Sequence, residues 1–454
     1  MTMTRATGLS WLGIVRLGLV QTSLGAIIVL TTTVINRVMV VELALPAMLP
    51  GILVGIHHAV QMSRPRFGHG SDVGGRTTGW IVGGMIVLAL GGVAAAAGTV
   101  LIASTMFWGL VVSTLAFVAI GLGASAAGTS TLVTLAKHVA PHRKAAAATI
   151  VWIMMIAGFA VTAGVAGSFL DPFTPMRLLT VTACVSAIAV SVTLASVFRL
   201  EPKGSLSAAN QEALRAQRGG FSLALRQVWQ EPEARRFTIF VFVSMLAYSA
   251  QDLILEPYAG VVFDMTPGES TSLSGLQHSG VLLGMILVAA TTLIRKNASS
   301  AVLRRWTIGG CLASALSLVA IASAAAFPQT WPLGGNVFVL GVSNGAFAVA
   351  AIASMMSLAS AGKEGAEGLR MGLWGASQAI AFAVGGFLGT VAIDVSRLFI
   401  EDPAVAYGFV FSLEAVMFVV AAIIGMRLRS AESSEQRPAP SFGEIAMVEV
   451  LNAR

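Results

Sequence analysis

Few side chains in this sequence could do chemistry, and most of those lie inside long apolar runs. His57 and His58 are adjacent, His278 follows a glutamine, and Glu414 is flanked by apolar residues. A neutral imidazole can ligate a metal, hydrogen-bond to a neighbouring helix or relay a proton. The interhelical hydrogen bond is the commoner case for each of these histidines, so both interpretations stay open.

Other polar residues lie within the apolar runs or near their ends: Asn36, Arg37, Glu42, Gln251, Asp252, Glu256, Asn344 and Gln378. A charged side chain at the centre of a membrane helix costs about 2.5–3.5 kcal/mol, so each should face a partner, a cavity or a ligand. Arg37 and Glu42 are close enough in sequence to pair across a hairpin. Glu414 is the only acid far from both ends of an apolar run. This predicts an interior with little charge, which would suit an apolar ligand.

The sequence gives no sign of the common catalytic and nucleotide sites. There is no Walker loop and no Cys-x-x-Cys pair, and the Gly-x-Ser-x-Gly match at 341–345 lies inside an apolar run, not at the strand-to-helix turn of a nucleophile elbow. The two Asp-rich motifs with which a membrane prenyltransferase holds magnesium diphosphate are missing as well. We therefore expect neither enzyme activity nor a metal or nucleotide site. Cys184 and Cys311 lie inside apolar runs and are interpreted as packing residues.

The composition indicates a membrane protein. Apolar residues make up 56% of the chain and charged residues 11%, and the mean hydropathy is +0.82. An ordinary soluble domain is nearer one quarter charged, and a soluble chain this apolar would expose large hydrophobic patches. The apolar runs are continuous and do not alternate, which favours transmembrane helices over barrel strands.

We expect twelve transmembrane helices, at residues 14–36, 43–62, 79–100, 106–136, 146–169, 177–198, 237–260, 276–294, 306–326, 333–360, 369–393 and 405–427. A polar connector separates the first six from the last six. The predicted organisation is an N-terminal half (1–198), a cytoplasmic linker (199–236), a C-terminal half (237–429) and a polar cytoplasmic tail (430–454).

Basic residues predict the orientation of this bundle. With both termini in the cytoplasm, only Arg37, Arg177 and Arg397 of the 28 Lys and Arg residues fall outside. Cytoplasmic loops of membrane proteins are enriched in Lys and Arg, as here. The net charge of +7 is thereby explained without a nucleic-acid partner.

The two halves show a weak repeat. In the first half, 121–128 (GLGASAAG), Trp152 and 169–171 (FLD) correspond to 341–347 (GVSNGAF), Trp374 and 387–389 (FLG) in the second. Equivalent runs with the same orientation imply parallel repeats, as in major facilitator transporters. The predicted fold class is all-α integral membrane, with twelve transmembrane helices in two parallel six-helix halves.

A loop after the second run agrees with this fold. Its Gly68, Asp72, Gly75 and Arg76 match the major facilitator loop motif Gly-x-Leu-x-Asp-Arg-x-Gly-Arg, while other positions depart from it. Glycines permit a tight turn there, and the Asp and Arg can pair or cap a neighbouring helix. The alternative is a plain Gly-rich basic turn.

Three long runs carry a resemblance to a known family: NRVMVVELALPAMLPG (36–51), QDLILEPYAGVVFDM (251–265) and LRMGLWGASQAIAFAVGGFLG (369–389). They resemble the PucC family, the bacteriochlorophyll delivery branch of the major facilitator superfamily, over residues 11–427. The resemblance is greatest to members found among bacteriochlorophyll-synthesis genes. It implies a multi-pass protein of the bacterial inner (intracytoplasmic) membrane, linked to light-harvesting complex assembly.

The ligand implied by this resemblance is bacteriochlorophyll or a precursor, held as cargo. Besides membrane lipid, the implied partners are light-harvesting apoproteins or pigment-synthesis enzymes. The residues that we expect to contact pigment are His57, His58, His278, Asn344, Trp374 and Gln378, by ligating magnesium, bonding carbonyls or stacking. The motif residues Asn36, Arg37, Glu42, Gln251, Asp252 and Glu256 carry over without assigned roles.

Two alternatives remain open. One is a proton-coupled major facilitator solute or drug transporter, for which a titratable residue such as Glu414 or Asp252 would be required. The other is a scaffold that recruits antenna subunits or pigment enzymes without binding pigment itself.

Overall fold

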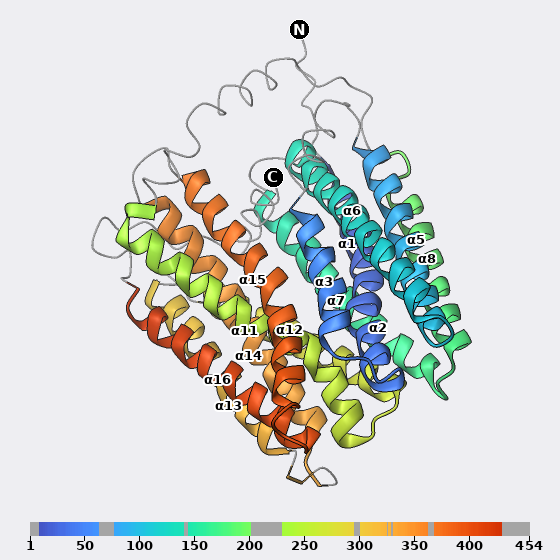
Figure 1. The fold of residues 1–454 in the computed structure, drawn as a ribbon. Helices are drawn as coiled ribbons and strands as arrows, with labels where there is room; N and C mark the ends of the chain where they lie inside the picture. Colours follow the sequence, from blue (N-terminus) through green and yellow to red (C-terminus); the bar gives the residue numbers. More distant parts are fainter. Residues whose placement is uncertain are drawn as a thin grey trace.

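The computed structural model describes residues 9–62, 77–139, 144–200, 229–294, 300–324, 326–327, 330–361 and 367–428. Within these ranges the chain is helical and contains no strand (Figure 1). The predicted loop motif at Gly68, Asp72, Gly75 and Arg76 lies outside the described residues, as do most of the linker and all of the tail.

The first half begins with one long helical rod, made of α1 (Trp11–Val29), η1 (Leu30–Val34), α2 (Ile35–Arg37) and η2 (Val38–Glu42). The two η segments are π-helical, with hydrogen bonds between residues five apart. The rod is followed by α3 (Met48–Gln61), α5 (Thr78–Ile102), α6 (Met106–His138), α7 (Lys144–Leu170) and α8 (Pro175–Val197).

The second half contains α11 (Pro232–Phe263), α12 (Pro267–Ile294), α13 (Ser300–Ala324), α14 (Leu333–Ala361), α15 (Glu367–Ser396) and α16 (Pro403–Met426). With the first rod counted once, the described residues form twelve helical rods. Eleven of them are long and apolar enough to cross a membrane. The exception is α3, which has 14 described residues.

Several helices begin earlier than hydropathy predicts, because their first turns are polar. The run expected at 276–294 is α12, which starts at Pro267. Thr266 and Glu269 form a reciprocal capping box there: the Thr266 N–H donates to Glu269 Oε2 at 2.9 Å, and the Glu269 N–H donates to Thr266 Oγ1 at 3.2 Å. Proline at the first helical position also opens α8, α11 and α16, where its missing N–H is not needed.

The first two rods are joined by a tight reversal at residues 43–47. Ala44 adopts a positive φ of 49° and Pro46 follows, so the helix expected at 43–62 starts only at Met48. We call the end of the bundle that carries this reversal the hairpin end. The basic-residue distribution predicts that this end faces outside.

Helix packing repeats between the halves. In the first half α1 packs against α7 and α8, and α5 packs against α6 and α8. In the second half α11 packs against α15 and α16, and α13 packs against α14 and α16. The two largest contacts between the halves, α7 with α12 and α3 with α15, are equivalent under the same repeat. Figure 1 shows the two halves meeting near the hairpin end.

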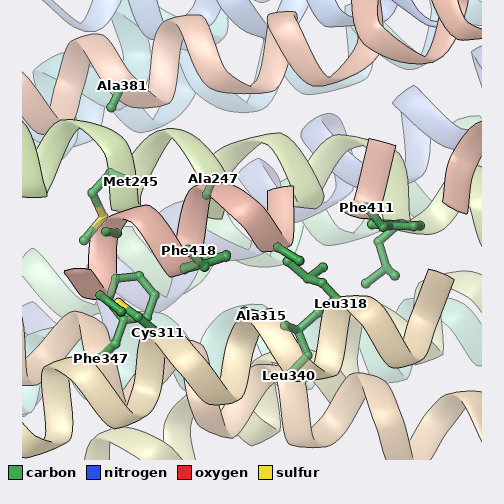
Figure 2. Packing of buried hydrophobic residues seen from close by; sticks show 14 of the residues in the cluster. Met245, Ala247, Cys311, Ala315, Leu318, Leu340, Phe347, Ala381, Phe411 and Phe418 are labelled. Carbon is green, nitrogen blue, oxygen red and sulfur yellow. The ribbon is translucent and has the colours of Figure 1, made fainter. Parts of the chain in front are cut away.

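Each half has its own apolar core. That of the second half includes Met245, Cys311, Phe347 and Phe418, which lie together on α11, α13, α14 and α16 (Figure 2). Cys311 is a free, fully buried thiol in this core, whereas Cys184 is exposed on α8.

Glycines bring several helices into backbone contact. An added Cβ at Gly280 or Gly284 would lie 2.4 Å or 2.1 Å from a carbonyl oxygen of α14. An added Cβ at Gly341 or Gly345 of α14 would in turn contact a carbonyl oxygen of α12. The two GxxxG motifs therefore interlock, as small residues do in membrane helix pairs. Gly79 and Gly83 have nothing within 4 Å of an added Cβ, so this GxxxG pair makes no such contact with the described residues.

Candidate functional site

Arg37 is buried at the hairpin end, where its guanidinium joins both halves. Its side chain is 2% exposed, its Nη1 lies 2.5 Å from Glu42 Oε1, and its Nη2 donates to the Met265 carbonyl at 2.6 Å. Gly260 makes room for it, since an added Cβ there would lie 2.9 Å from Nη2. The two residues that the sequence could pair across a hairpin do form an ion pair, and this pair is also anchored to the other half.

Asn36 and Glu256 extend this contact along the interface. The Asn36 amide donates to the Leu253 carbonyl of α11 at 2.6 Å. Glu256, one turn further along α11, is 2% exposed and within electrostatic range of Arg37. The hydroxyls of Thr33 and Ser274 lie near its carboxylate, but neither oxygen has normal hydrogen-bond geometry with a described residue.

Two aspartates cap helices of the opposite half. Asp171, after α7, accepts bonds from the Thr266 hydroxyl at 2.5 Å and the Gly268 N–H at 3.2 Å, at the start of α12. Asp394, near the end of α15, accepts from the backbone N–H groups of Ala47 and Met48 at 2.9 Å and 2.7 Å, at the start of α3. A carboxylate is favourable at a helix N-terminus, where free N–H groups and the helix dipole meet it.

The sequence interpretation missed these two caps. It aligned 169–171 with 387–389, whereas the structure matches Asp171 with Asp394 by their equivalent contacts. A usable signal was present: each aspartate directly follows, or closes, the apolar run of the fifth helix in its half.

A second polar group lies deeper in the second half. Asp252 is half-buried and receives a long bond of 3.5 Å from the Gln277 amide. Glu414 on α16 is 2% exposed, neither of its oxygens has a partner among the described residues, and Asp252 is close enough to repel it. Gln251 is fully buried, and both of its amide atoms lack partners in the described part of the chain.

The expectation of a nearly uncharged interior is therefore wrong for the second half. Asp252, Glu256 and Glu414 all lie within it. The expected helix 237–260 extends in fact to Phe263, and packing of the first rod against α11 covers the segment that hydropathy placed near the surface.

The six residues predicted to contact pigment differ in how deeply they are buried. His57, Trp374 and Asn344 are fully buried. His57 lies 2.7 Å from the Gln61 amide of its own helix, whereas Trp374 donates to the Ala234 carbonyl of α11 at 3.2 Å and Asn344 accepts from Ser314 of α13 at 2.8 Å. His58, His278 and Gln378 are half-buried and retain accessible surface. The structure therefore leaves three of the six side chains reachable by a large ligand.

His58 and His278 lie at different contacts between the halves. The His58 ring is 6.1 Å from the Phe382 ring of α15, one helical turn from Gln378. The His278 ring meets the Phe159 ring of α7 edge-on at 5.2 Å, and its Nδ1 lies 2.9 Å from the Ser274 carbonyl. A carbonyl accepts only from a protonated nitrogen, so the Nε2 of a neutral His278 is left with a free lone pair.

Within the described residues, no three His, Cys, Asp or Glu side chains come together as a metal-binding group.

Comparison with known proteins identifies the family of this chain. The family model described as "PUCC protein" matches residues 34–433. The chain belongs to the PUCC family.

Relatives of this PUCC-family chain agree with that assignment. It is 48% identical over 438 residues to the "Bacteriochlorophyll synthase 44.5 kDa chain" of Rhodobacter capsulatus, covering 96% of this chain and 100% of the relative. It is 28% identical to the "Protein PucC" of the same organism, covering 90% of each chain. The PUCC-family chain is thus a multi-pass membrane protein, and one of its relatives is named for bacteriochlorophyll synthesis.

Solved structures share its fold. A D-xylose-proton symporter matches with a TM-score of 0.66 at 12% identity, covering 93% of this chain and 99% of that one. A peptide transporter in complex with sulfate matches with a TM-score of 0.63 at 15% identity, covering 92% and 94%. These likenesses confirm the predicted major facilitator-like fold of two six-helix halves.

Proposed function

We propose that this protein binds bacteriochlorophyll or a precursor within the membrane and delivers it during assembly of photosynthetic complexes or late pigment synthesis. The name of one relative refers to bacteriochlorophyll. Charged residues make up only 11% of the chain, and the side chains beside His278 at the α7–α12 contact are apolar, which suits a large apolar ligand.

The observation that carries this proposal is the geometry of His278. Its Nδ1 is held by the Ser274 carbonyl, so its Nε2 has a free lone pair and a fixed direction. Such a nitrogen is suited to the open axial position of a pigment's magnesium. Phe159 lies beside the imidazole, and Trp152 and Met155 line the same α7–α12 contact, so that apolar side chains would cover part of the macrocycle.

The test is pigment binding by the purified protein. We expect bacteriochlorophyll added to the detergent-solubilised chain to give bound near-infrared absorbance, with a Kd that rises at least about tenfold, or 1.4 kcal/mol, in His278→Ala. His138→Ala is the matched control, because its Nδ1 also lies near the carbonyl four residues before it, at 3.1 Å, but at the far end of α6. Equal binding by all three proteins would contradict the role of His278, and no binding by the wild type would refute the function.

We propose further that the protein handles pigment without synthesising it, although one relative carries "synthase" in its name. The six aspartates of the chain are all at least eight residues apart, so no Asp-rich diphosphate motif can form. Purified protein supplied with the unesterified pigment, a prenyl diphosphate and Mg²⁺ should yield no esterified product. Co-purification with light-harvesting apoproteins or pigment enzymes from a pigment-less strain would identify the partner that receives or supplies the pigment.

A second candidate is alternating-access transport, and the fold likeness to a proton symporter together with the buried carboxylates favours it. Spin labels at Ser104 and Phe399 report the hairpin end, and labels at Met62 and Met426 report the opposite end. A transporter should show reciprocal changes of the two distances when pigment or another substrate is added. Unchanged distances with bound pigment would support a pigment-binding protein that does not use alternating access.

A further inference from the structure

Asp252 and Glu414 lie at the same depth of the second half. Helices α11 and α16 run antiparallel, and their register is fixed by the Tyr258 ring, which meets the rings of Tyr407 at 5.6 Å and Phe411 at 5.0 Å. Asp252 lies six residues before Tyr258 on α11, and Glu414 lies three residues after Phe411 on α16. Because the helices are antiparallel, both residues lie about 5–10 Å from the aromatic contact in the same direction along the helix axes. In this register Asp252 is within electrostatic range of Glu414.

Glu414 is buried and Asp252 is half-buried, and neither forms an ion pair with a described residue. Both Glu414 oxygens lack hydrogen-bond partners in the described part of the chain, and Asp252 has only the long bond from Gln277. Gln251 precedes Asp252 and adds a fully buried amide whose nitrogen and oxygen are both unpartnered among those residues. Two ionised carboxylates cannot share such a site unless a cation neutralises one of them.

Titratable neighbours on the surrounding helices do not supply that charge. Tyr248 on α11 lies within electrostatic range of Asp252. Tyr258, Tyr407 and Cys311 lie in the apolar core of the second half. All four are neutral in their ordinary state. The nearest buried guanidinium described is Arg37, and it faces Glu42 and Glu256 beyond the next turn of α11.

We propose that Asp252 and Glu414 form a monovalent-cation site, and that the cation they hold is a proton. The proton resides on Glu414, the more deeply buried group, and Asp252 is the half-buried member through which it exchanges. A multivalent metal needs more ligands than two carboxylates, and no third His, Cys, Asp or Glu among the described residues joins them. A proton needs only one oxygen.

The experiment is carboxyl labelling of the full chain in liposomes with N,N′-dicyclohexylcarbodiimide. This hydrophobic reagent adds to a protonated carboxyl group in apolar surroundings and stays attached, so peptide mass spectrometry identifies the site. We expect label on Glu414 at neutral pH, declining as the pH rises, and loss of that label in Glu414→Gln. Asp394 is the internal control in the same sample, because its carboxylate accepts two backbone N–H bonds and should stay unlabelled.

The variant Asp252→Asn tests the coupling between the two groups. It should keep the label on Glu414 but shift the loss of labelling to lower pH, because the neighbouring negative charge is gone. If Glu414→Gln does not fold, the wild-type peptide map and the Asp252→Asn profile still decide the matter.

Three outcomes would overturn the proposal: no label on Glu414 in the folded wild type, an unchanged pH profile in Asp252→Asn, or protection from labelling by Na⁺ but not by choline. The last would assign the site to a metal cation. The inference goes beyond pigment binding, and the two fail separately, since labelling concerns α11 and α16 whereas pigment absorbance concerns His278 on α12.

Discussion

At the residue scale, buried polar side chains fall into two groups. Many hydroxyls donate to the carbonyl four residues before them, as in Thr31 to Ile27, Thr131 to Ala127 and Thr307 to Leu303. These groups are satisfied within their own helix and serve packing. Gln251, Glu256 and Glu414 keep buried atoms without partners among the described residues, and each such atom costs about 1–3 kcal/mol. Of these three, Gln251 and Glu256 belong to the motif residues that carry over from the family resemblance.

Arg37 offers a prediction at this scale. Arg37→Met would leave Glu42 and Glu256 without their shared counter-charge, and breaking a buried pair in this way costs about 3–5 kcal/mol. Denaturant or thermal unfolding of the detergent-solubilised protein should show this loss. Arg236→Met is the matched control: its ion pair with Glu233 is 49% and 35% exposed, so we expect a change of about 0–1 kcal/mol. Similar losses for both variants would contradict the role given to Arg37.

At the element scale, α12 has close backbone neighbours on two sides. It interlocks with α14 through paired GxxxG motifs, and an added Cβ at its Gly275 would lie 2.7 Å from the backbone nitrogen of Gly164 on α7. Its own half and the opposite half therefore both fix its position. The capping box at Thr266 and Glu269 holds its first turn at the hairpin end.

Gly275→Val should force α7 and α12 apart. Overpacking of this kind costs about 1–3 kcal/mol, and we expect a lower melting temperature together with weaker pigment binding at the adjacent His278. Gly309→Val on α13 is the control, since nothing lies within 4 Å of a Cβ there. Pigment binding that survives in Gly275→Val would place the pigment away from the α7–α12 contact.

At the scale of the whole molecule, the halves are joined by the same device twice. Each half places an aspartate from the end of its fifth helix on the first turn of the other half's second helix. The Arg37 and Asn36 contacts lie on the same side of the bundle. The hairpin end is therefore held closed by carboxylates whose bonds are to backbone N–H groups and one hydroxyl.

Asp171→Asn with Asp394→Asn should loosen this end, because an amide lacks the charge that favours a helix N-terminus. Loss of the charge should cost about 0.3–1 kcal/mol at each cap. Spin labels at Ser104 and Phe399 should show a longer or broader distance distribution in the double variant than in either single one. An unchanged distribution would mean that the apolar contacts alone hold the end closed. Asp402→Asn, a cap within the second half only, should leave the distance unchanged.

Much of the architecture could be predicted from the sequence. Apolar runs indicated the helices, and the weak repeat indicated two parallel halves, because lipid forces every spanning segment to satisfy its own backbone. Helix starts were less accurate: the polar first turn of α12 is invisible to hydropathy, although Thr266-Pro267-Gly268-Glu269 carries a capping signal.

The candidate site was predictable only in part. The Arg37–Glu42 pair follows from spacing along one hairpin, so it could be expected. The Asp252–Glu414 proximity and the aspartate caps join helices that are distant in sequence, and their register depends on packing that a single sequence does not reveal. For the same reason the burial of Trp374, which donates to Ala234, could not be separated in advance from exposure to a ligand.

The π-helical turns of the first rod let it hold an extra residue without changing the faces on either side. A turn with hydrogen bonds five residues apart holds one residue more than an α-helical turn, in about the same rotation. Deleting one residue between Leu30 and Val34 would therefore let the rod close into a regular α-helix while Asn36 and Arg37 still face Leu253 and Met265. The same deletion within α1 would rotate that face by about 100°. In the relatives of this chain, a gap within Leu30–Val34 should be tolerated better than a gap elsewhere in the rod.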